Sequence, residues 1–418
     1  MSWRERLGRN WGRLGMKFDT IKLSELAEIQ TGPFGSQLHK EDYVVNGTPI
    51  VTVEHLGNRK FTEQNLPCVS DKDKERLKKY MLKTGDIVFS RVGSVDRCSY
   101  VSAEYEGWMF SGRCLRVRPC EILNSEYLYY FFSLKETKQF VRNIATGATM
   151  PSINTKFMGE VPIRVPSMEA QNKIASILWM IDDKIELNEK INNNLLEQAI
   201  ALYEHLLQEA EWPTATILDV AKKVAMGPFG SNIKISTFVP EGVPIISGNH
   251  LRGYFLEEPE FNYITEEHAE RLKNSIVFSH DLIFTHAGNI GQVAMIPDGC
   301  KYDRYVLSQR QFYLRCDETK VVPEFLLLFF HSASGQHELL SYANQTGVPS
   351  IAQPASNLKK IPFKYPPMHE QLMWQKQVHP LLSQYLNNRL ENERLSSLRD
   401  TLLPKLMSGE LDVSDIEL

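Results

Sequence analysis

A heptad run from Met168 to Glu211 constrains the fold more than any other feature of this sequence. The run contains neither proline nor glycine. Its seam positions advance in alternating steps of four and three residues, the repeat of a helix that packs along another helix. At ~1.5 Å per residue the helix is roughly 60 Å long, so it needs a partner of similar length. The seam is formed by Ile174, Leu178, Ile181, Ile185, Asn188, Asn192, Leu195, Ala199, Leu202 and Leu206.

A second run, 200 residues further along the chain, provides that partner. Its seam is formed by Trp374, Val378, Leu381, Tyr385, Asn388, Asn392, Leu395, Arg399, Leu402 and Leu406. If the two helices pair antiparallel, Asn188 faces Asn392 and Asn192 faces Asn388. Polar pairs in an apolar seam fix its register, because a slipped pairing buries an amide against leucine. The alternative is that these asparagines are exposed on a solvated helix.

The segments that precede the two helices are copies of each other. Residues 22–56 align with residues 217–251, and GPFGS is identical at Gly32–Ser36 and Gly227–Ser231. Short Val/Ile/Phe-rich runs bounded by Gly, Pro and Asn predict strands and turns. One helical stretch is expected in each copy, at Ser125–Val141 and Glu324–Leu340. The fold class is therefore α+β, with two β-rich mixed domains related by internal duplication and separated by two long helices that form an intramolecular antiparallel coiled coil.

This duplication predicts six parts. They are a basic N-terminal extension (1–16), a first globular domain (17–167), a first spacer helix (168–211), a second globular domain (212–367), a second spacer helix (368–410) and a tail (411–418). The extension carries four arginines, and a basic arm that contacts phosphate is the alternative interpretation. Antiparallel pairing is expected to put the two domains at opposite ends of the helices. Arg399 interrupts an otherwise apolar seam, and Pro404 is expected to kink or end the second helix, so the last heptad is expected to fold back on the first domain.

Charge is distributed unevenly along the chain. Lys plus Arg minus Asp plus Glu is 25 − 19 = +6 for residues 1–167 and 3 − 9 = −6 for residues 168–211. Acidic helices suit protein partners and repel phosphates. Six cysteines match neither a zinc site nor a redox pair, which favours reduced thiols. No apolar run is long enough to span a bilayer, and no secretory signal is evident, so we expect a cytoplasmic protein.

The sequence lacks the motifs of the common enzyme classes. It contains no GxxxxGK[ST] phosphate loop, no HExxH and no GxSxG. Tyr365-Pro366-Pro367-Met368 is interpreted as the turn that enters the second helix. His39, His55, His250 and His286 fall in predicted loops and suit hydrogen bonding better than metal ligation. We therefore expect a non-catalytic protein without a cofactor or metal.

Loops that differ between the two copies are the candidates for ligand recognition. Arg91 and Ser94 of the first copy become His286 and Asn289 of the second, and Gln37 and His39 become Asn232 and Lys234. Such donors and acceptors recognise base edges or phosphates. Arg113 and Arg310 match each other, which suits a phosphate clamp or a structural salt bridge. The remaining candidates are Ser36, Ser231, Thr146, Thr149, Gln345 and Thr346. For each residue the alternative is an ordinary solvated loop side chain.

One known family is similar to this chain in a combination of features. They are the two modules, the GPFGS loops, the helix entries VPIRVPSMEAQ (161–171) and IPFKYPPMHEQ (361–371), and the closing LRDTLLPKLMSGEL (398–411). The chain after residue 16 resembles the DNA-specificity subunit of type I restriction–modification systems. The resemblance implies that each globular domain is a target recognition domain for one half of a split, asymmetric site in double-stranded DNA. It also implies that the helices measure the gap and bind two adenine-N6 methyltransferase subunits, and that restriction subunits join the complex.

Two other functions are compatible with the sequence. One is a non-catalytic scaffold whose modules bind proteins, which predicts no salt-sensitive DNA affinity. The other is the specificity subunit of a methyltransferase-only system, since a nuclease would lie on another chain.

Overall fold

The computed structural model describes residues 18–34, 37–344, 347–414 and 416. The expected extension 1–16 and the candidate residues Ser36, Gln345 and Thr346 lie outside the described residues. The chain divides into two compact units. Unit 1 contains the residues up to Glu189 together with those from Arg389 onward, and unit 2 contains Lys190–Asn388. Each unit therefore combines one β-rich module with half of each long helix, whereas the expected domain boundaries lie at the helix ends.

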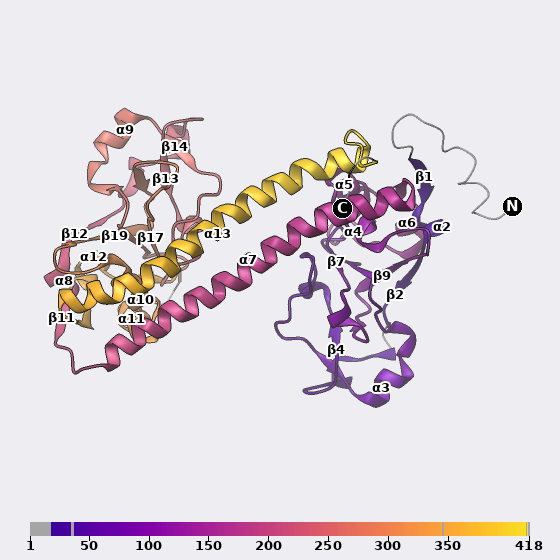
Figure 1. The fold of residues 1–418 in the computed structure, drawn as a ribbon, viewed down its shortest axis with the longest axis horizontal. Coiled ribbons are helices and arrows are strands. Elements are labelled where there is room, and N and C mark those ends of the chain that lie inside the picture. Colours follow the sequence, from indigo (N-terminus) through magenta and orange to yellow (C-terminus); the bar gives the residue numbers. More distant parts are fainter. Residues whose placement is uncertain (1–17, 35–36, 345–346, 415, 417–418) are drawn as a thin grey trace. The chain divides into compact units, whose positions relative to one another are not determined.

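The described residues of unit 1 form two four-stranded sheets and a two-stranded sheet (Figure 1). The first four-stranded sheet is antiparallel throughout, whereas β4 and β8 of the second sheet pair in parallel. In spatial order the sheets are β2 (Ala27–Thr31), β9 (Cys114–Pro119), β6 (Ile87–Ser90) and β7 (Cys98–Tyr100); β3 (Tyr43–Val44), β5 (Cys68–Val69), β4 (Thr48–Val51) and β8 (Met109–Phe110); and β1 (Asp19–Lys22) with β10 (Pro162–Val165). The helices of this module are α2 (Leu23–Leu26), α3 (Asp71–Arg76), α4 (Ser125–Ser133), α5 (Lys135–Ile144) and α6 (Thr155–Gly159).

Unit 2 repeats the first four-stranded sheet and the separate strand pair of unit 1, but its second four-stranded sheet is built from a partly different set of strands. Its two four-stranded sheets are β12 (Ala221–Met226), β19 (Gln311–Cys316), β16 (Leu282–Thr285) and β17 (Val293–Met295), and β14 (Asn262–Ile264), β13 (Val243–Ile246), β18 (Tyr305–Leu307) and β15 (Ile276–Val277). Two-stranded sheets join β11 (Thr214–Thr216) with β22 (Pro362–Lys364) and β20 (Ala343–Asn344) with β21 (Ser350–Ile351). The helices are α8 (Ile217–Val220), α9 (Glu266–Arg271), α10 (Pro323–His331), α11 (Ala333–Leu340) and α12 (Pro354–Leu358).

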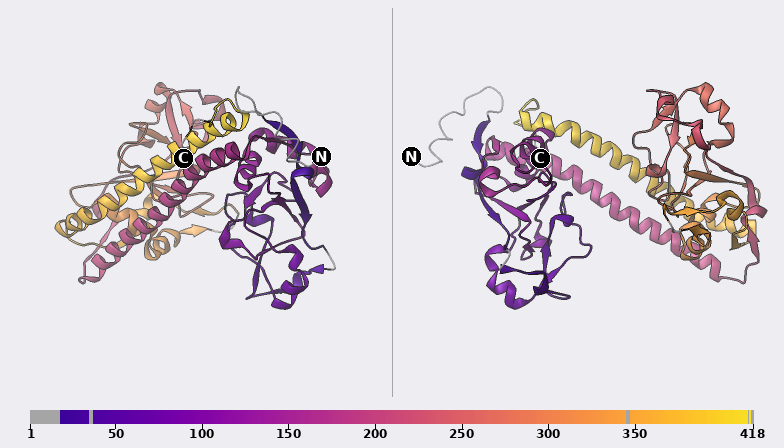
Figure 2. Two further views of the ribbon diagram at one scale, coloured as in Figure 1. Left: turned by 45° about the vertical axis from the view of Figure 1, so that its right-hand side comes forward. Right: turned by 180° about the vertical axis from the view of Figure 1, so that it is seen from behind.

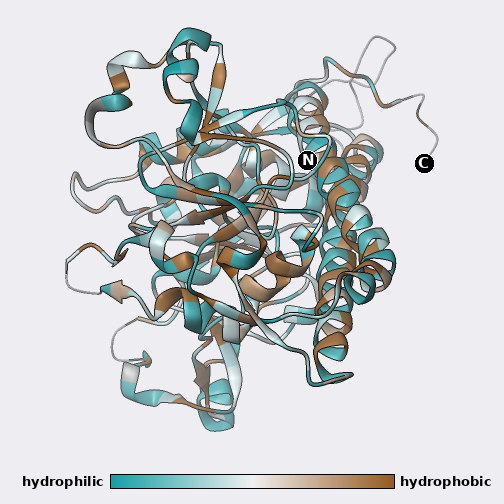
Figure 3. Cartoon of the chain, turned by 90° about the vertical axis from the view of Figure 1, so that its left-hand side faces the viewer, coloured by the Kyte–Doolittle hydropathy of each residue, from teal (hydrophilic) through white to brown (hydrophobic). Residues whose placement is uncertain are grey.

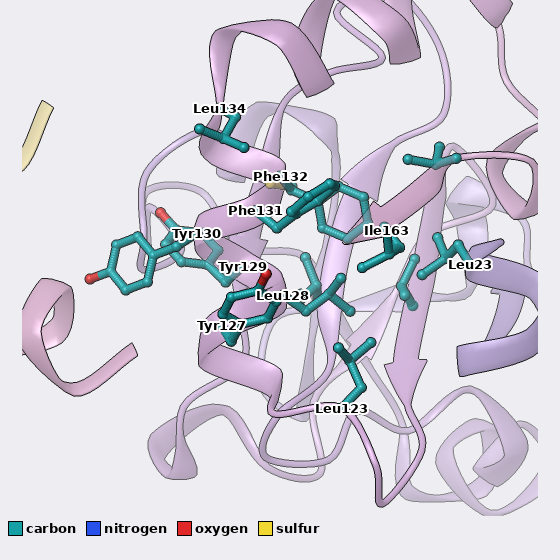
Figure 4. Packing of buried hydrophobic residues seen from close by; sticks show 14 of the residues in the cluster. Leu23, Leu123, Tyr127, Leu128, Tyr129, Tyr130, Phe131, Phe132, Leu134 and Ile163 are labelled. Carbon is teal, nitrogen blue, oxygen red and sulfur yellow. The ribbon is translucent and has the colours of Figure 1, made fainter. Parts of the chain in front are cut away.

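Each module is stabilised by an almost wholly buried aromatic helix and a buried ion pair. In unit 1, residues 127–132 of α4 are all buried and belong to one hydrophobic cluster with Leu23 and Ile163, and Figure 4 shows Tyr129 and Tyr130 on the side of α4 away from those two residues. The carboxylate of Asp86 accepts hydrogen bonds from Nε and Nη2 of Arg118, both at 2.7 Å. Asp281 and Arg315 form the same bidentate pair in unit 2. The two copies thus share this ion pair as well as the strand order of their first four-stranded sheet.

The long helices are α7 (Met168–Gln208) and α13 (Met368–Ser408). They run side by side in both views of Figure 2, and Figure 3 shows hydrophobic and hydrophilic residues alternating along them. All twenty predicted seam residues are buried or half-buried. In unit 1, Asn188 Nδ2 donates to Asn392 Oδ1 at 2.8 Å; in unit 2, Asn388 Nδ2 donates to Asn192 Oδ1 at 2.9 Å. These are the pairs that the phase of the seams predicts, and the asparagines are not solvated surface residues.

A buried glutamine joins each module to its own helix. Gln171 Oε1 accepts from the backbone N–H of Asn124 at 2.8 Å, and its Nε2 donates to the carbonyl of Pro166 at 3.1 Å. Gln371 Oε1 accepts from the N–H of Val322 at 3.0 Å, and its Nε2 donates to the carbonyl of Pro366 at 2.8 Å. We call these two hydrogen bonds of the glutamine side chain the glutamine clasp. They explain why both helix entries, Pro-Ser-Met-Glu-Ala-Gln and Pro-Pro-Met-His-Glu-Gln, end in glutamine.

Two predictions about helices were wrong. The single helical stretch expected in each module is two helices, with a non-helical residue between them at Leu134 and at Ser332. In unit 2 the break lets Gly335 approach the Phe329 carbonyl so closely that a β-carbon would lie 2.0 Å from that oxygen. Pro404 does not end α13, which continues to Ser408 and stops at Gly409, where φ is +79°.

The last heptad of α13 does not fold back, because the helix continues unbroken to Ser408, but it does pack against the first module. Leu403, Leu406, Met407 and Val413 belong to the hydrophobic core of unit 1.

Candidate nucleic-acid interface

Three strand ends and one turn form a loop cluster at the edge of the first sheet in unit 1. Strand β2 ends at Thr31, β6 ends at Ser90 and β9 begins at Cys114, and their antiparallel order brings these ends together. The fourth segment, the turn 146–152, is joined to the cluster by a hydrogen bond from Gly93 N–H to the Pro151 carbonyl at 2.8 Å. We call residues 32–34, 91–94, 111–113 and 146–152 the recognition edge of unit 1.

Arg91 lies at the centre of this edge. Its backbone N–H donates to the carbonyl of Arg113 at 2.8 Å, and its carbonyl accepts from Ile153 N–H at 3.0 Å. The guanidinium carbon lies 4.6 Å from the centre of the Phe34 ring, and Nη1 donates to the Gly112 carbonyl at 3.3 Å. Nε has no hydrogen-bond partner among the residues that the structure describes. Nε is buried, so the neighbours orient this half-buried side chain and only the outer part of its guanidinium is left for a ligand.

The recognition edge of unit 2 consists of the described residues among 227–230, 286–289, 308–310 and 343–351. His286 occupies the backbone position in it that Arg91 occupies in unit 1. Its N–H donates to the Arg310 carbonyl at 2.9 Å, and its carbonyl accepts from Ile351 N–H at 2.8 Å. Its Nε2 lies 3.1 Å from the Gln309 carbonyl oxygen. The frame of the two edges is thus the same, while an arginine in one is replaced by a histidine in the other.

Several other predicted residues also lie at these edges with exposed side chains. They are Ser94, Arg113, Thr146 and Thr149 in unit 1 and Asn289 and Arg310 in unit 2. Within the described part of the chain neither Arg113 nor Arg310 forms an ion pair, so the structural salt bridge considered for them is not formed there. Both guanidinium groups face solvent beside the central residue of their edge.

The second group of predicted residues follows each GPFGS loop. The Oε1 of Gln37 accepts from the Tyr80 hydroxyl at 2.7 Å, and the Gln37 carbonyl accepts from Arg76. The exposed residue His39 donates its N–H to Asp42 Oδ2 at 2.7 Å. Asn232 and Lys234 are exposed. The side chain of Ser231 lies outside the described part of the structure, like the candidates Ser36, Gln345 and Thr346 named above.

The first glycine of GPFGS is required by packing. A β-carbon on Gly32 would lie 2.2 Å from the carbonyl oxygen of Ser111, and one on Gly227 would lie 2.0 Å from that of Ser308. Only glycine permits this approach. The loop consequently presents its phenylalanine outward: the exposed fraction of Phe34 is 48 % and that of Phe229 is 70 %. Met150 and Val348 are also exposed at the two turns. Sequence reasoning missed these apolar side chains because their exposure depends on the loop path.

Arg59 is a second residue that sequence reasoning missed. Its guanidinium lies over the ring of Trp179 at 4.5 Å and donates to Asp183 and Glu186, both at 2.6 Å. These three partners are on α7, so the contact braces a loop of the module against its helix. In unit 2 the equivalent residue, Tyr254, stacks on His331 with ring centres 3.8 Å apart.

The described residues contain no group of three or more His, Cys, Asp or Glu that could hold a metal ion. His55 and His250 each accept a backbone N–H at Nδ1, which gives them a structural role in their turns. All six cysteines are free, and burial raises the pKa of the Cys114 thiol, beneath the recognition edge, to about 12. No helix in the described part of the chain is both long and apolar enough to cross a membrane.

Comparison with known proteins gives a consistent result. The model of the type I restriction modification DNA specificity domain matches residues 16–197 and 209–399. The MjaIX specificity subunit of Methanocaldococcus jannaschii is 24 % identical, with 97 % of this chain and 96 % of that protein covered. The HindI specificity subunit of Haemophilus influenzae is 22 % identical, with 93 % and 100 % covered. The crystal structure of a type I S subunit from M. genitalium shares the fold, with a TM-score of 0.58 at 15 % identity over 96 % of this chain and 97 % of that one.

The family model covers both modules and most of both long helices. Its members are the subunits that carry DNA specificity in a type I complex, in which catalysis lies in the methyltransferase and restriction subunits. The chain belongs to this family, the DNA-specificity subunits of type I restriction–modification systems, and contains two target recognition domains.

Proposed function

We propose that each recognition edge contacts one half of a bipartite, asymmetric site in double-stranded DNA. The observation that carries this proposal is the equivalence of the two edges: the same backbone hydrogen bonds hold Arg91 in one and His286 in the other. A shared frame with different side chains suits two half-sites of different sequence. Arginine can donate two hydrogen bonds to guanine, whereas histidine and asparagine recognise other patterns. Arg113 and Arg310, which match, suit phosphates.

The helices are proposed to set the gap between the half-sites and to bind two methyltransferase subunits, with restriction subunits completing the complex. Each long helix has 41 residues, which corresponds to roughly 60 Å. In unit 1, Met180 and Leu187 lie one heptad apart on α7 and are each 52 % exposed, and Leu398 on α13 is 47 % exposed. Exposed apolar side chains on an acidic helix pair favour a protein partner over DNA.

Methylation mapping tests half-site recognition directly. The chain is expressed with its cognate methyltransferase, and N6-methyladenine in host DNA is located by single-molecule sequencing. We expect a motif of two short, unlike halves separated by a fixed gap. Arg91→Ala should relax one half and His286→Ala the other. If Arg91 makes a bidentate base contact, its loss should weaken binding by about 1–3 kcal/mol.

Two control variants distinguish base contacts from other effects. Arg113→Ala should weaken binding to all sequences and lower the salt dependence by about one phosphate contact. Arg164→Ala replaces an exposed arginine on β10, in the separate two-stranded sheet, and should change neither half. If an assembled, active methyltransferase complex yields no methylated motif, or if Arg91→Ala and His286→Ala change both halves alike, half-site recognition by these edges is wrong.

A further inference from the structure

Arg399 is the one charged residue in the two predicted seams, and unit 1 supplies its partner. Its Nη1 donates to Asp182 Oδ1 at 2.8 Å. The other carboxylate oxygen of Asp182 accepts from the Tyr130 hydroxyl at 2.6 Å. Tyr130 is 2 % exposed and Asp182 is 9 % exposed. We call Tyr130, Asp182 and Arg399 the polar junction, because the three residues join α4, α7 and α13.

The equivalent junction in unit 2 is wholly apolar. The repeat places Leu328 where unit 1 has Tyr130, Leu382 where it has Asp182, and Ala199 where it has Arg399. These three side chains are also buried and belong to one hydrophobic cluster. The duplicated architecture therefore contains one polar and one apolar version of the same three-helix contact.

Among the polar and charged positions of the seams, the asparagines do not oppose pairing of a helix with a second copy of itself, whereas the apolar positions differ in size where Trp374 and Tyr385 replace Ile174 and Ile185. The two seams have the same phase, so α7 against α7 of another chain would again place Asn188 opposite Asn192. The α13 residues Leu402 and Leu406, which pack into unit 1, would be replaced by Leu202 and Leu206. Neither the asparagines nor these leucines distinguish like from unlike pairing.

The polar junction does distinguish them. In a pair of two α7 helices, Asp182 would face Ala199 of the second copy and its buried carboxylate would lack a guanidinium. In a pair of two α13 helices, the half-buried Arg399 would face Leu382 of the second copy and keep only its hydrogen bonds to the exposed Asp400 of its own helix, so the larger penalty falls on Asp182. Leaving one member of a buried ion pair without its partner is strongly unfavourable, whereas replacing both members by apolar residues is not.

An ion pair on the flank of the seam acts in the same direction. Lys184 Nζ lies 3.3 Å from Glu391 Oε2. Like pairing would place Lys184 beside Ile191 and Glu391 beside Gln384. Both groups are about half exposed, so this pair adds less than the buried one.

We infer that the polar junction selects the pairing partner of each half of the chain, where a half is a module with the long helix that follows it. Each half then pairs with the other half and not with a second copy of itself. The kind of partner that fits the α7 face of unit 1 is therefore the C-terminal half of this chain. Such selection keeps two different modules in every specificity subunit. That consequence for the asymmetry of the DNA site rests on the proposed function, whereas the selection itself does not.

A cut chain tests the inference. A protease site is placed between Ala210 and Glu211, which are exposed in the connection from α7 to β11. The full chain is cut, its two pieces are separated in urea, and both are returned to buffer together. Native mass spectrometry then counts mixed pairs, which contain one N-terminal and one C-terminal piece, and like pairs, which contain two identical pieces. The wild-type chain should return mixed pairs. Tyr130→Leu with Asp182→Leu and Arg399→Ala copies the apolar junction of unit 2 and should raise the ratio of like to mixed pairs on the order of 100-fold.

Control variants make the result specific to the charge pair. Arg399→Lys keeps the charge and should retain mixed pairs, as should Arg394→Ala, which removes an exposed arginine from the same helix. If the triple variant does not refold, Asp182→Asn with Arg399→Gln removes both charges at nearly constant shape and carries the same expectation. Two results would overturn the inference. One is that the wild-type pieces form pairs of identical pieces as often as random association predicts. The other is that a refolded uncharged variant forms only mixed pairs. DNA is absent, so failure of half-site recognition does not affect this readout.

Discussion

Replacing Gln371 by alanine tests whether the shared helix-entry motif is a structural clasp. Gln371 is fully buried, and its amide group satisfies the N–H of Val322 and the carbonyl of Pro366. Alanine leaves both backbone groups without these partners at a buried position. An unsatisfied buried group costs ~1–3 kcal/mol, so two such groups should lower the free energy of unfolding of unit 2 by about 2–6 kcal/mol.

Urea denaturation combined with amide hydrogen exchange can measure this effect and locate it. In Gln371→Ala we expect faster exchange at residues 320–326 and 366–372, with little change in unit 1. Gln171→Ala is the matched variant and should have the converse effect, because Gln171 holds Asn124 and Pro166 in the same way. Gln198→Ala replaces an exposed glutamine on α7 and should be nearly neutral.

Gln371→Glu provides an internal check on the reasoning. Glutamate keeps an acceptor for Val322 but loses the amide donors and introduces a charge at a fully buried position, so it should destabilise at least as much as alanine. The clasp interpretation is refuted if both alanine variants lose less than about 0.5 kcal/mol, the range of ordinary surface substitutions. It is also refuted if hydrogen exchange changes elsewhere than at the helix entries.

Three further predictions concern the loop, the seam and pH. Gly227→Ala places a β-carbon 2.0 Å from the Ser308 carbonyl oxygen; it should lower the thermal unfolding temperature of unit 2 and weaken binding to one half-site, as measured by calorimetry and by DNA titration. Asn188→Leu alone should destabilise unit 1 by about 1–3 kcal/mol because the amide of Asn392 loses its partner, whereas leucine at both positions should restore or raise the urea midpoint. Burial lowers the pKa of His331, so the unfolded chain takes up a proton more readily; its contribution to stability is present above the unfolded pKa of about 6.5 and is lost as pH falls below that value. His331→Gln should flatten the decline in unfolding temperature between about pH 7 and 5, and an unchanged slope would contradict this assignment.

Periodicity was sufficient to predict the helix pair. Apolar residues spaced by steps of four and three residues lie on one face of a helix. Because the two seams have the same phase, only one antiparallel register places each asparagine opposite another asparagine. Both Asn188–Asn392 and Asn192–Asn388 hydrogen bonds are present. The duplication likewise predicted two equivalent modules, because aligned strand and turn signals require aligned folds. That the asparagines set the register, and that particular edge residues contact DNA, remain predictions.

Other features could not be predicted from local pattern. The break at Leu134 follows no glycine or proline, and Pro404 lies inside a helix whose last turns are held by the core of unit 1. In both cases tertiary packing outweighs local propensity. The loop candidates are a third example: Arg91 is oriented by Phe34 and Gly112, which are far from it in sequence.

The sequence by itself determined the elements that repeat: two modules, two seams and the register between them. Such features depend on regular spacing, which a single chain displays directly. Only the tertiary structure decided which of the residues that differ between the copies contact one another. Arg399 looked like an irregularity in its seam until Asp182 and Tyr130 were found beside it. A buried charge is interpretable only through its partner, and that partner lies on another helix more than 200 residues away.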